Sequence, residues 1–77
     1  MIEKIRELLE DINPEVSNLE SVESSLLAEG IIDSFDIISM IEQLEEKFDI
    51  EIEATDITAE NFDSIASIAG LVESKVN

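Results

Sequence analysis

The apolar residues between positions 37 and 48 recur three and four residues apart, and this spacing constrains the fold more than any other feature. Residues at such intervals share one face of an α-helix. The stripe that they form here consists of Ile37, Met40, Ile41, Leu44 and Phe48. Most of the positions between them hold acidic or other polar side chains. The segment therefore predicts an amphipathic helix that ends near Phe48 or Asp49 and turns one face toward a core.

Two further stretches have the same helical period. The first predicts a helix with the apolar residues Ile2, Ile5, Leu8, Leu9 and Ile12. It ends at Asn13, because the residue before a proline is pushed out of helical geometry. Ser64 is positioned to cap a last helix, whose inward residues are Ile65, Ile68, Ala69, Val72 and Val76. Gly70 lies inside this helix, where it weakens the helix slightly and leaves room for close packing.

The segments between these helices are less regular. Residues 14–32 predict a long connection that folds over the core, with a short helical turn at 24–28. Ile50, Ile52 and Ala54 alternate with acids as in a strand, but an isolated strand has no partner, so we expect an extended linker. Thr58 caps a short helix over residues 59–62. The 77 residues thus predict one domain over 1–77, an all-α bundle of three main helices plus one short helix.

The chain is strongly acidic, with 20 acidic against four basic residues and a net charge of −16. This charge argues against binding to nucleic acid or to an anionic membrane surface, and it favours partners with basic surfaces. The chain has no cysteine, which excludes a disulfide or a thiolate metal site. It has neither the apolar core of a signal peptide nor an apolar run of membrane-spanning length. We expect a cytoplasmic monomer that does not insert into membranes.

Ser34 lies at the beginning of the acidic helix, where Asp33 or Ser34 itself supplies the N-cap. Free backbone N–H groups and the helix dipole stabilise a phosphate at such a position. Asp-Ser before an apolar run is also a routine cap, so the dipeptide alone does not establish a function. The chain has no histidine and no basic residue near Ser34 in sequence, so a serine nucleophile would lack its base. This pattern indicates that another protein acts on Ser34, and it favours a carrier over an enzyme.

A longer motif surrounds this serine. Residues 26–36 read Leu-Leu-Ala-Glu-Gly-Ile-Ile-Asp-Ser-Phe-Asp, followed by Ile38, by Leu-Glu-Glu-Lys-Phe-Asp-Ile-Glu-Ile at 44–52 and by Asn-Phe-Asp-Ser-Ile at 61–65. In these motifs the chain resembles the acyl carrier and peptidyl carrier protein family over nearly its whole length, with least support before Leu19.

The resemblance implies that a transferase attaches phosphopantetheine from coenzyme A to Ser34, within a motif that includes Asp33. The thiol of this arm then carries an acyl or aminoacyl group as a thioester. The partners implied are this transferase, a loading ligase and acyl-processing enzymes with basic docking surfaces. The residues expected to face them are Phe35, Asp36, Ile38, Glu42 and Glu45. The residues expected to line a cavity for the acyl group are Ile41, Leu44, Ile65 and Ile68.

Three positions depart from the family pattern. Phe35 replaces the leucine that usually follows the serine, Ser39 stands where carriers of fatty-acid synthesis usually have an acid, and Glu42 stands where they often have an apolar residue. These departures favour a specialised stand-alone carrier. Fatty acid, polyketide and nonribosomal peptide synthesis all remain open as its pathway.

Two functions without a prosthetic group are the alternatives. The first is an acidic adaptor that docks a basic partner. The second is divalent-cation binding, since several acids lie near the offsets of a calcium loop, namely Asp49, Glu51, Glu53, Asp56 and Glu60. Ala54 occupies the position where that loop needs glycine, so the sequence predicts loose cation binding and no dedicated metal site.

Overall fold

The structure is a computed structural model that describes residues 1–76. Its elements follow in the order α1 (Ile2–Ile12), the 3₁₀ helix η1 (Pro14–Asn18), α2 (Ser34–Phe48), the 3₁₀ helix η2 (Ala54–Asp56), α3 (Ala59–Phe62) and α4 (Ile65–Lys75). The described part of the chain contains no strand, and residues 50–53 form an extended connection as predicted. Three helices of 11 or 15 residues and one of four residues confirm the predicted all-α bundle.

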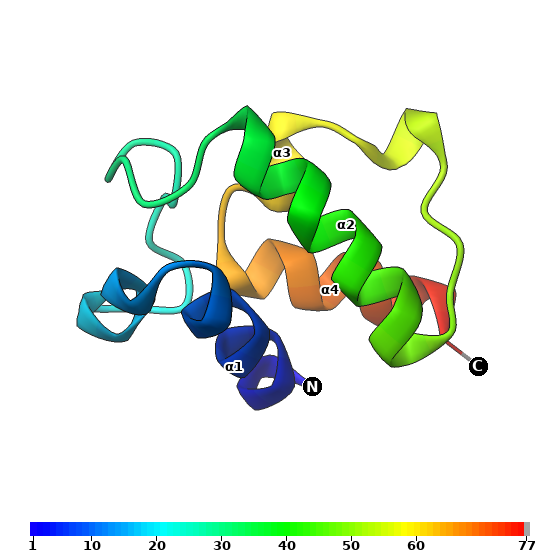
Figure 1. Cartoon of the computed structure of the whole chain (residues 1–77), viewed down its shortest axis with the longest axis horizontal. Coiled ribbons are helices and arrows are strands. Elements are labelled where there is room, and N and C mark those ends of the chain that lie inside the picture. Colours follow the sequence, from blue (N-terminus) through cyan, green and yellow to red (C-terminus); the bar gives the residue numbers. More distant parts are fainter. Residues whose placement is uncertain (77) are drawn as a thin grey trace.

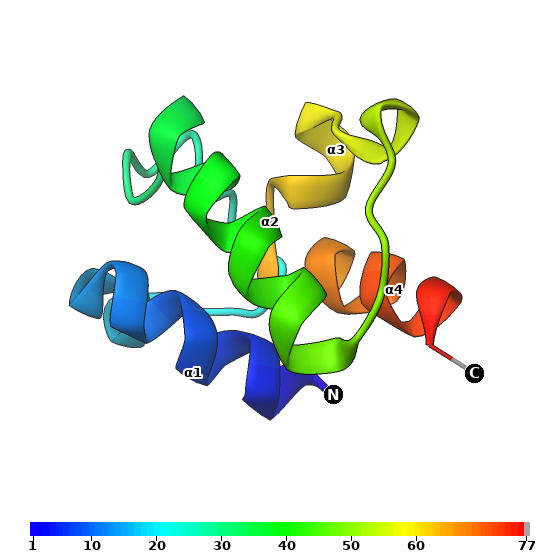
Figure 2. The same ribbon diagram turned by 45° about the vertical axis from the view of Figure 1, so that its right-hand side comes forward.

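The three long helices enclose one hydrophobic core. Helix α2 packs against α1 and runs obliquely in front of α4 in Figure 1, and the short α3 packs against α4 (Figures 1 and 2). The largest fully buried side chains are Phe62, Ile5, Leu9, Leu26, Met40, Leu44, Ile65, Ile68, Val16 and Val72. On α2 the stripe is buried to different depths, because Met40 and Leu44 are fully enclosed whereas Ile37, Ile41 and Phe48 are only partly covered.

Five details differ from the predictions. Ile2 is 37% exposed at the start of α1, and Leu71 joins the core without having been predicted there. The sequence pattern did not indicate η1 or η2, since segments of three to five residues are too short to show a helical period. A hydrogen-bonded turn over residues 26–30 replaces the helical turn predicted at 24–28. Gly70 makes no close contact, because a Cβ added there would meet nothing within 4 Å.

The long connection between η1 and α2 is fixed to the rest of the molecule by hydrogen bonds. The Asn13 side-chain amide donates to the Ile31 carbonyl at 2.7 Å, and the Ala66 N–H donates to the Val22 carbonyl at 2.9 Å. The Leu26 N–H donates to the Asp63 carbonyl at 2.6 Å. The partners of the connection come from both the N-terminal and the C-terminal part of the chain. Together these hydrogen bonds determine the position of Ser34, the first residue of α2.

Candidate functional site

The N-terminus of α2 is closed by a reciprocal pair of hydrogen bonds. The Asp33 carboxylate accepts the Asp36 N–H at 3.0 Å, and the Asp33 N–H donates to the Asp36 carboxylate at 3.2 Å. This arrangement is a capping box, with Asp33 as the N-cap. The sequence allowed either Asp33 or Ser34 as the N-cap, and the structure shows that Asp33 takes this position.

Ser34 is the first residue of α2, and its side chain is exposed. The capping box joins Asp33 to Asp36 and does not involve the Ser34 hydroxyl. The first N–H groups of a helix have no partner within the helix, and they carry the positive end of its dipole. A phosphate ester on this hydroxyl therefore fits the site, since it would extend into solvent beside donors of the right polarity.

An apolar surface surrounds this serine. Phe35 is 80% exposed, Ile38 is 58% exposed and Ile57 is 46% exposed, which is unusual for side chains of this size. An open groove of about 430 Å³ begins at Ser34 and is here named the Ser34 groove. Its lining residues are Leu27, Ser34, Ile37, Ile38, Ile41, Ile57, Thr58 and Ala59. Helix α2 forms one wall of this groove, and the segment 57–59 forms the outer wall.

Only one of the four residues predicted to line an acyl cavity reaches this groove. Ile41 lines it, whereas Leu44, Ile65 and Ile68 are at most 1% exposed within the core. A cavity lined by those three side chains stays a prediction. Leu27 and Ile57 could not be predicted as lining residues, because both lie in irregular segments whose place depends on distant contacts.

The residues predicted to face partners occupy different environments. Phe35 and Ile38 are strongly exposed, and Glu42 lies exposed on α2. Asp36 is half-buried and takes part in the capping box. Glu45 has a structural contact that the sequence did not predict, because its carboxylate accepts the Ile52 N–H at 2.9 Å and so fixes the chain beyond α2. For all five residues, contact with a partner stays a prediction.

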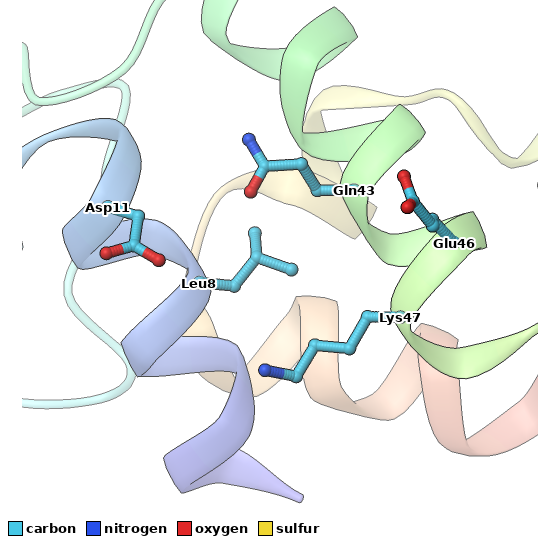
Figure 3. Close-up of a pocket in the computed structure, with 5 residues that line it drawn as sticks. All are labelled: Leu8, Asp11, Gln43, Glu46 and Lys47. Atoms are coloured by element: carbon cyan, nitrogen blue, oxygen red, sulfur yellow. The ribbon is translucent and has the colours of Figure 1, made fainter.

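A second groove lies between α1 and α2, and it carries mixed charge. It has a volume of about 240 Å³ and is lined by Leu8, Asp11, Gln43, Glu46 and Lys47. Figure 3 shows the Lys47 side chain extending from α2 toward α1, with Leu8 between the two helices. Ser34 is not among its lining residues, so this groove is separate from the Ser34 site.

Two of the acids that resembled a calcium loop have structural roles. Asp49 ends α2 in the left-handed conformation with φ 53°, and the Asp56 carboxylate binds the Lys75 ammonium group at 2.5 Å. Within residues 1–76, no three acidic side chains are grouped so that they could hold a metal ion. The hydrogen bond from Lys75 lowers the pKa of Asp56, and the bond to Asp56 raises the pKa of Lys75.

Comparison with known proteins assigns this arrangement to a family. Residues 3–72 match the family model described as "Phosphopantetheine attachment site". The chain belongs to this family of carrier proteins. It is 31% identical to the D-alanyl carrier protein of Lactococcus lactis subsp. cremoris over 77 residues, which cover 100% of this chain and 98% of that protein. It is 32% identical over 54 residues to the D-alanyl carrier protein of Bacillus cereus, covering 70% of this chain and 68% of that one.

A solved structure shows the same fold. The solution structure of a holo acyl carrier protein from Nitrosomonas europaea superposes with a TM-score of 0.78 and 31% identity, covering 95% of this chain and 92% of that chain. The protein is thus a carrier that bears an acyl or aminoacyl group on covalently attached phosphopantetheine, and it is not an enzyme. It interacts with a phosphopantetheinyl transferase and with acyl-processing enzymes. None of the helices within residues 1–76 has the length and apolar character needed to cross a membrane.

Proposed function

We propose that Ser34 is the residue that carries the phosphopantetheine arm. The observation that supports this most is the exposed hydroxyl at the first position of α2, left out of the capping box and at the edge of an apolar groove. In the transfer, the Ser34 oxygen forms a phosphodiester with the pantetheine-bearing phosphorus of coenzyme A. Adenosine 3′,5′-bisphosphate leaves, and the transferase takes the hydroxyl proton. The bound arm supplies a thiol that forms a thioester with the cargo.

The proposed cargo is a small amino acid, with D-alanine as the first candidate. D-alanyl carrier proteins match this chain over its full length. The Ser34 groove is open to solvent, and three of the four aliphatic residues predicted to enclose a longer chain lie buried in the core. Both features suit a short cargo, since neither encloses a long chain. A fatty acyl cargo is the second candidate, and it is supported by the match to a holo acyl carrier protein.

Phe35 and Ile38 are the proposed apolar centre of the partner interface, with Asp36, Glu42 and Glu45 as its acidic side chains. Exposed aromatic and aliphatic anchors supply binding energy on desolvation, whereas acidic residues at the edge speed association with a basic partner. The partners would be the transferase and an ATP-dependent ligase that activates the cargo. The carrier would meet them as a monomer in the cytoplasm, with residues 1–77 acting as one domain.

The attachment site is tested by intact mass after incubation with coenzyme A and a broad-specificity phosphopantetheinyl transferase. The wild type and Ser39→Ala should both gain one arm, since Ser39 is an exposed serine on the same helix. Ser34→Ala should gain none. Modification of Ser34→Ala would show that another residue carries the arm.

The cargo is tested on the modified protein by supplying ligases and ATP with D-alanine, L-alanine or a fatty acid. A thioester with D-alanine, formed faster than with the other two, is the expected result. Loading by the fatty acid alone would support the second candidate and place the carrier in fatty acid synthesis.

A further inference from the structure

The outer wall of the Ser34 groove belongs to residues 53–61, a largely exposed segment that has few contacts with the rest of the molecule. Ile57, Thr58 and Ala59 are all exposed, although they form one side of the groove. The segment is anchored in the core only at its two ends, by Ile52 and Phe62, which are 8% and 0% exposed. The outer wall lies between these anchors, so other contacts must determine its distance from α2.

The hydrogen bonds within this segment are local. The Asp56 N–H donates to the Glu53 carbonyl at 2.9 Å, and the Glu53 N–H donates to the Asp56 carboxylate at the same distance. The Asn61 side-chain amide donates to the Asp56 carbonyl at 2.8 Å. These bonds give the segment its shape, but they do not tie it to another part of the chain.

Lys75 supplies the long-range polar contact. Its ammonium group lies 2.5 Å from the Asp56 carboxylate and 4.0 Å from that of Glu53, across 19 and 22 positions of sequence. The Lys75 and Asp56 side chains are only 21% and 20% exposed, so this ion pair is shielded more than an ordinary surface pair. We name the Lys75–Asp56 ion pair the strut, because it links the end of α4 to the residue before Ile57.

We propose that Lys75 is a positioning residue that holds the outer wall of the Ser34 groove at its observed distance from α2, and that the strut thereby limits the size of the cargo that the groove shelters. This inference rests on the proposed attachment of the arm to Ser34. Without the strut, the local bonds around Asp56 remain and the segment moves as a unit between Ile52 and Phe62. The wall would then move away from Ile38 and Ile41, and the groove would accept a longer apolar group.

The first test needs no arm. Amide hydrogen exchange is measured on the unmodified protein for the wild type, Lys75→Met, Lys75→Arg and Lys47→Met. Lys75→Met keeps an apolar stem of similar length and removes the charge, whereas Lys47→Met removes an equal charge on α2. We expect exchange over residues 53–61 to be about five-fold faster in Lys75→Met, with no change over residues 26–32, since a single ion pair shifts local opening by a factor of this order. Lys75→Arg should restore the wild-type rate.

The second test measures cargo size. Acyl-phosphopantetheine groups of increasing chain length are transferred from the matching acyl-coenzyme A, and the hydrolysis rate of each thioester is measured. In the wild type and Lys47→Met, the protection of the thioester from hydrolysis should stop increasing once the acyl chain passes a short length. In Lys75→Met, this protection should continue to increase through acyl chains at least two carbons longer. An identical profile for Lys75→Met, or the same change in Lys47→Met, would overturn the proposal. If the wild type takes up no arm, the proposed function fails, while the exchange experiment still decides whether Lys75 holds the wall.

Discussion

The Asp63 carboxylate accepts a hydrogen bond from the Ser25 hydroxyl at 2.7 Å, although 38 residues separate the two in sequence. The same oxygen atom accepts the Leu27 N–H at 3.3 Å. Asp63 lies between α3 and α4, so it fixes the long connection that leads to Ser34 and places Leu27 on the groove. Asp63 therefore connects the junction of α3 and α4 to the segment that leads to Ser34.

Replacing Asp63 should therefore destabilise the protein. Asp63→Ala leaves the Ser25 hydroxyl and the Leu27 N–H without their acceptor, which costs about 1–3 kcal/mol of unfolding free energy. Urea denaturation measures this loss. Glu60→Ala is the matched control, since Glu60 is an exposed acid on the adjacent α3 and should change stability by less than about 0.5 kcal/mol. Equal effects of the two substitutions would contradict this account of Asp63.

The two glycines should respond in opposite directions to alanine. Gly70 lies inside α4 in open space, so Gly70→Ala should stabilise the protein by about 0.5–1 kcal/mol through helix propensity. Gly30 has φ +71° in the turn before α2, and Gly30→Ala should destabilise by about 1–2 kcal/mol because L-residues are strained there. Thermal unfolding of both variants checks the signs. A destabilised Gly70→Ala would indicate a contact at this position.

The capping function of Asp33 can be separated from its charge. Asp33→Ala removes the side chain that accepts the Asp36 N–H, and it should cost about 1 kcal/mol. Asn caps a helix nearly as well as Asp, so Asp33→Asn should keep most of this stability. If the transferase recognises the Asp33 charge, both variants should be modified more slowly than the wild type. A normal rate for Asp33→Asn would assign Asp33 to capping alone.

The strut should contribute to stability in a pH-dependent manner. Lys75 lowers the pKa of Asp56 below its ordinary value of 3.8, so the contribution is present above that value and is lost as the pH falls through the pKa of the folded state. We expect the stability difference between the wild type and Asp56→Asn to be constant from pH 5 to 8 and to shrink below about pH 4. Parallel urea titrations measure it. A difference that grows on acidification would contradict the sign of this pKa shift.

The sequence predicted the parts of this molecule that depend on local pattern. The apolar period on α2 and the caps at Ser64 and Thr58 needed only neighbouring residues, and the structure confirms them. The Ser34 groove depends instead on Leu27 and Ile57, which come from irregular segments. Their positions are fixed by Asp63 and by Lys75, and both contacts span many residues. No local signal identifies such partners, so the part that Leu27 and Ile57 take in lining this groove could not be predicted from the sequence.

The central claim is that Ser34 bears the arm, and peptide mapping by tandem mass spectrometry tests it most directly. The protein is treated with coenzyme A and transferase and digested with protease, and the fragment ions locate the added phosphopantetheine. The account predicts a single modified site, at Ser34. Modification at another serine, such as Ser39, would contradict it, as would the absence of any modification in a folded protein treated with active transferase.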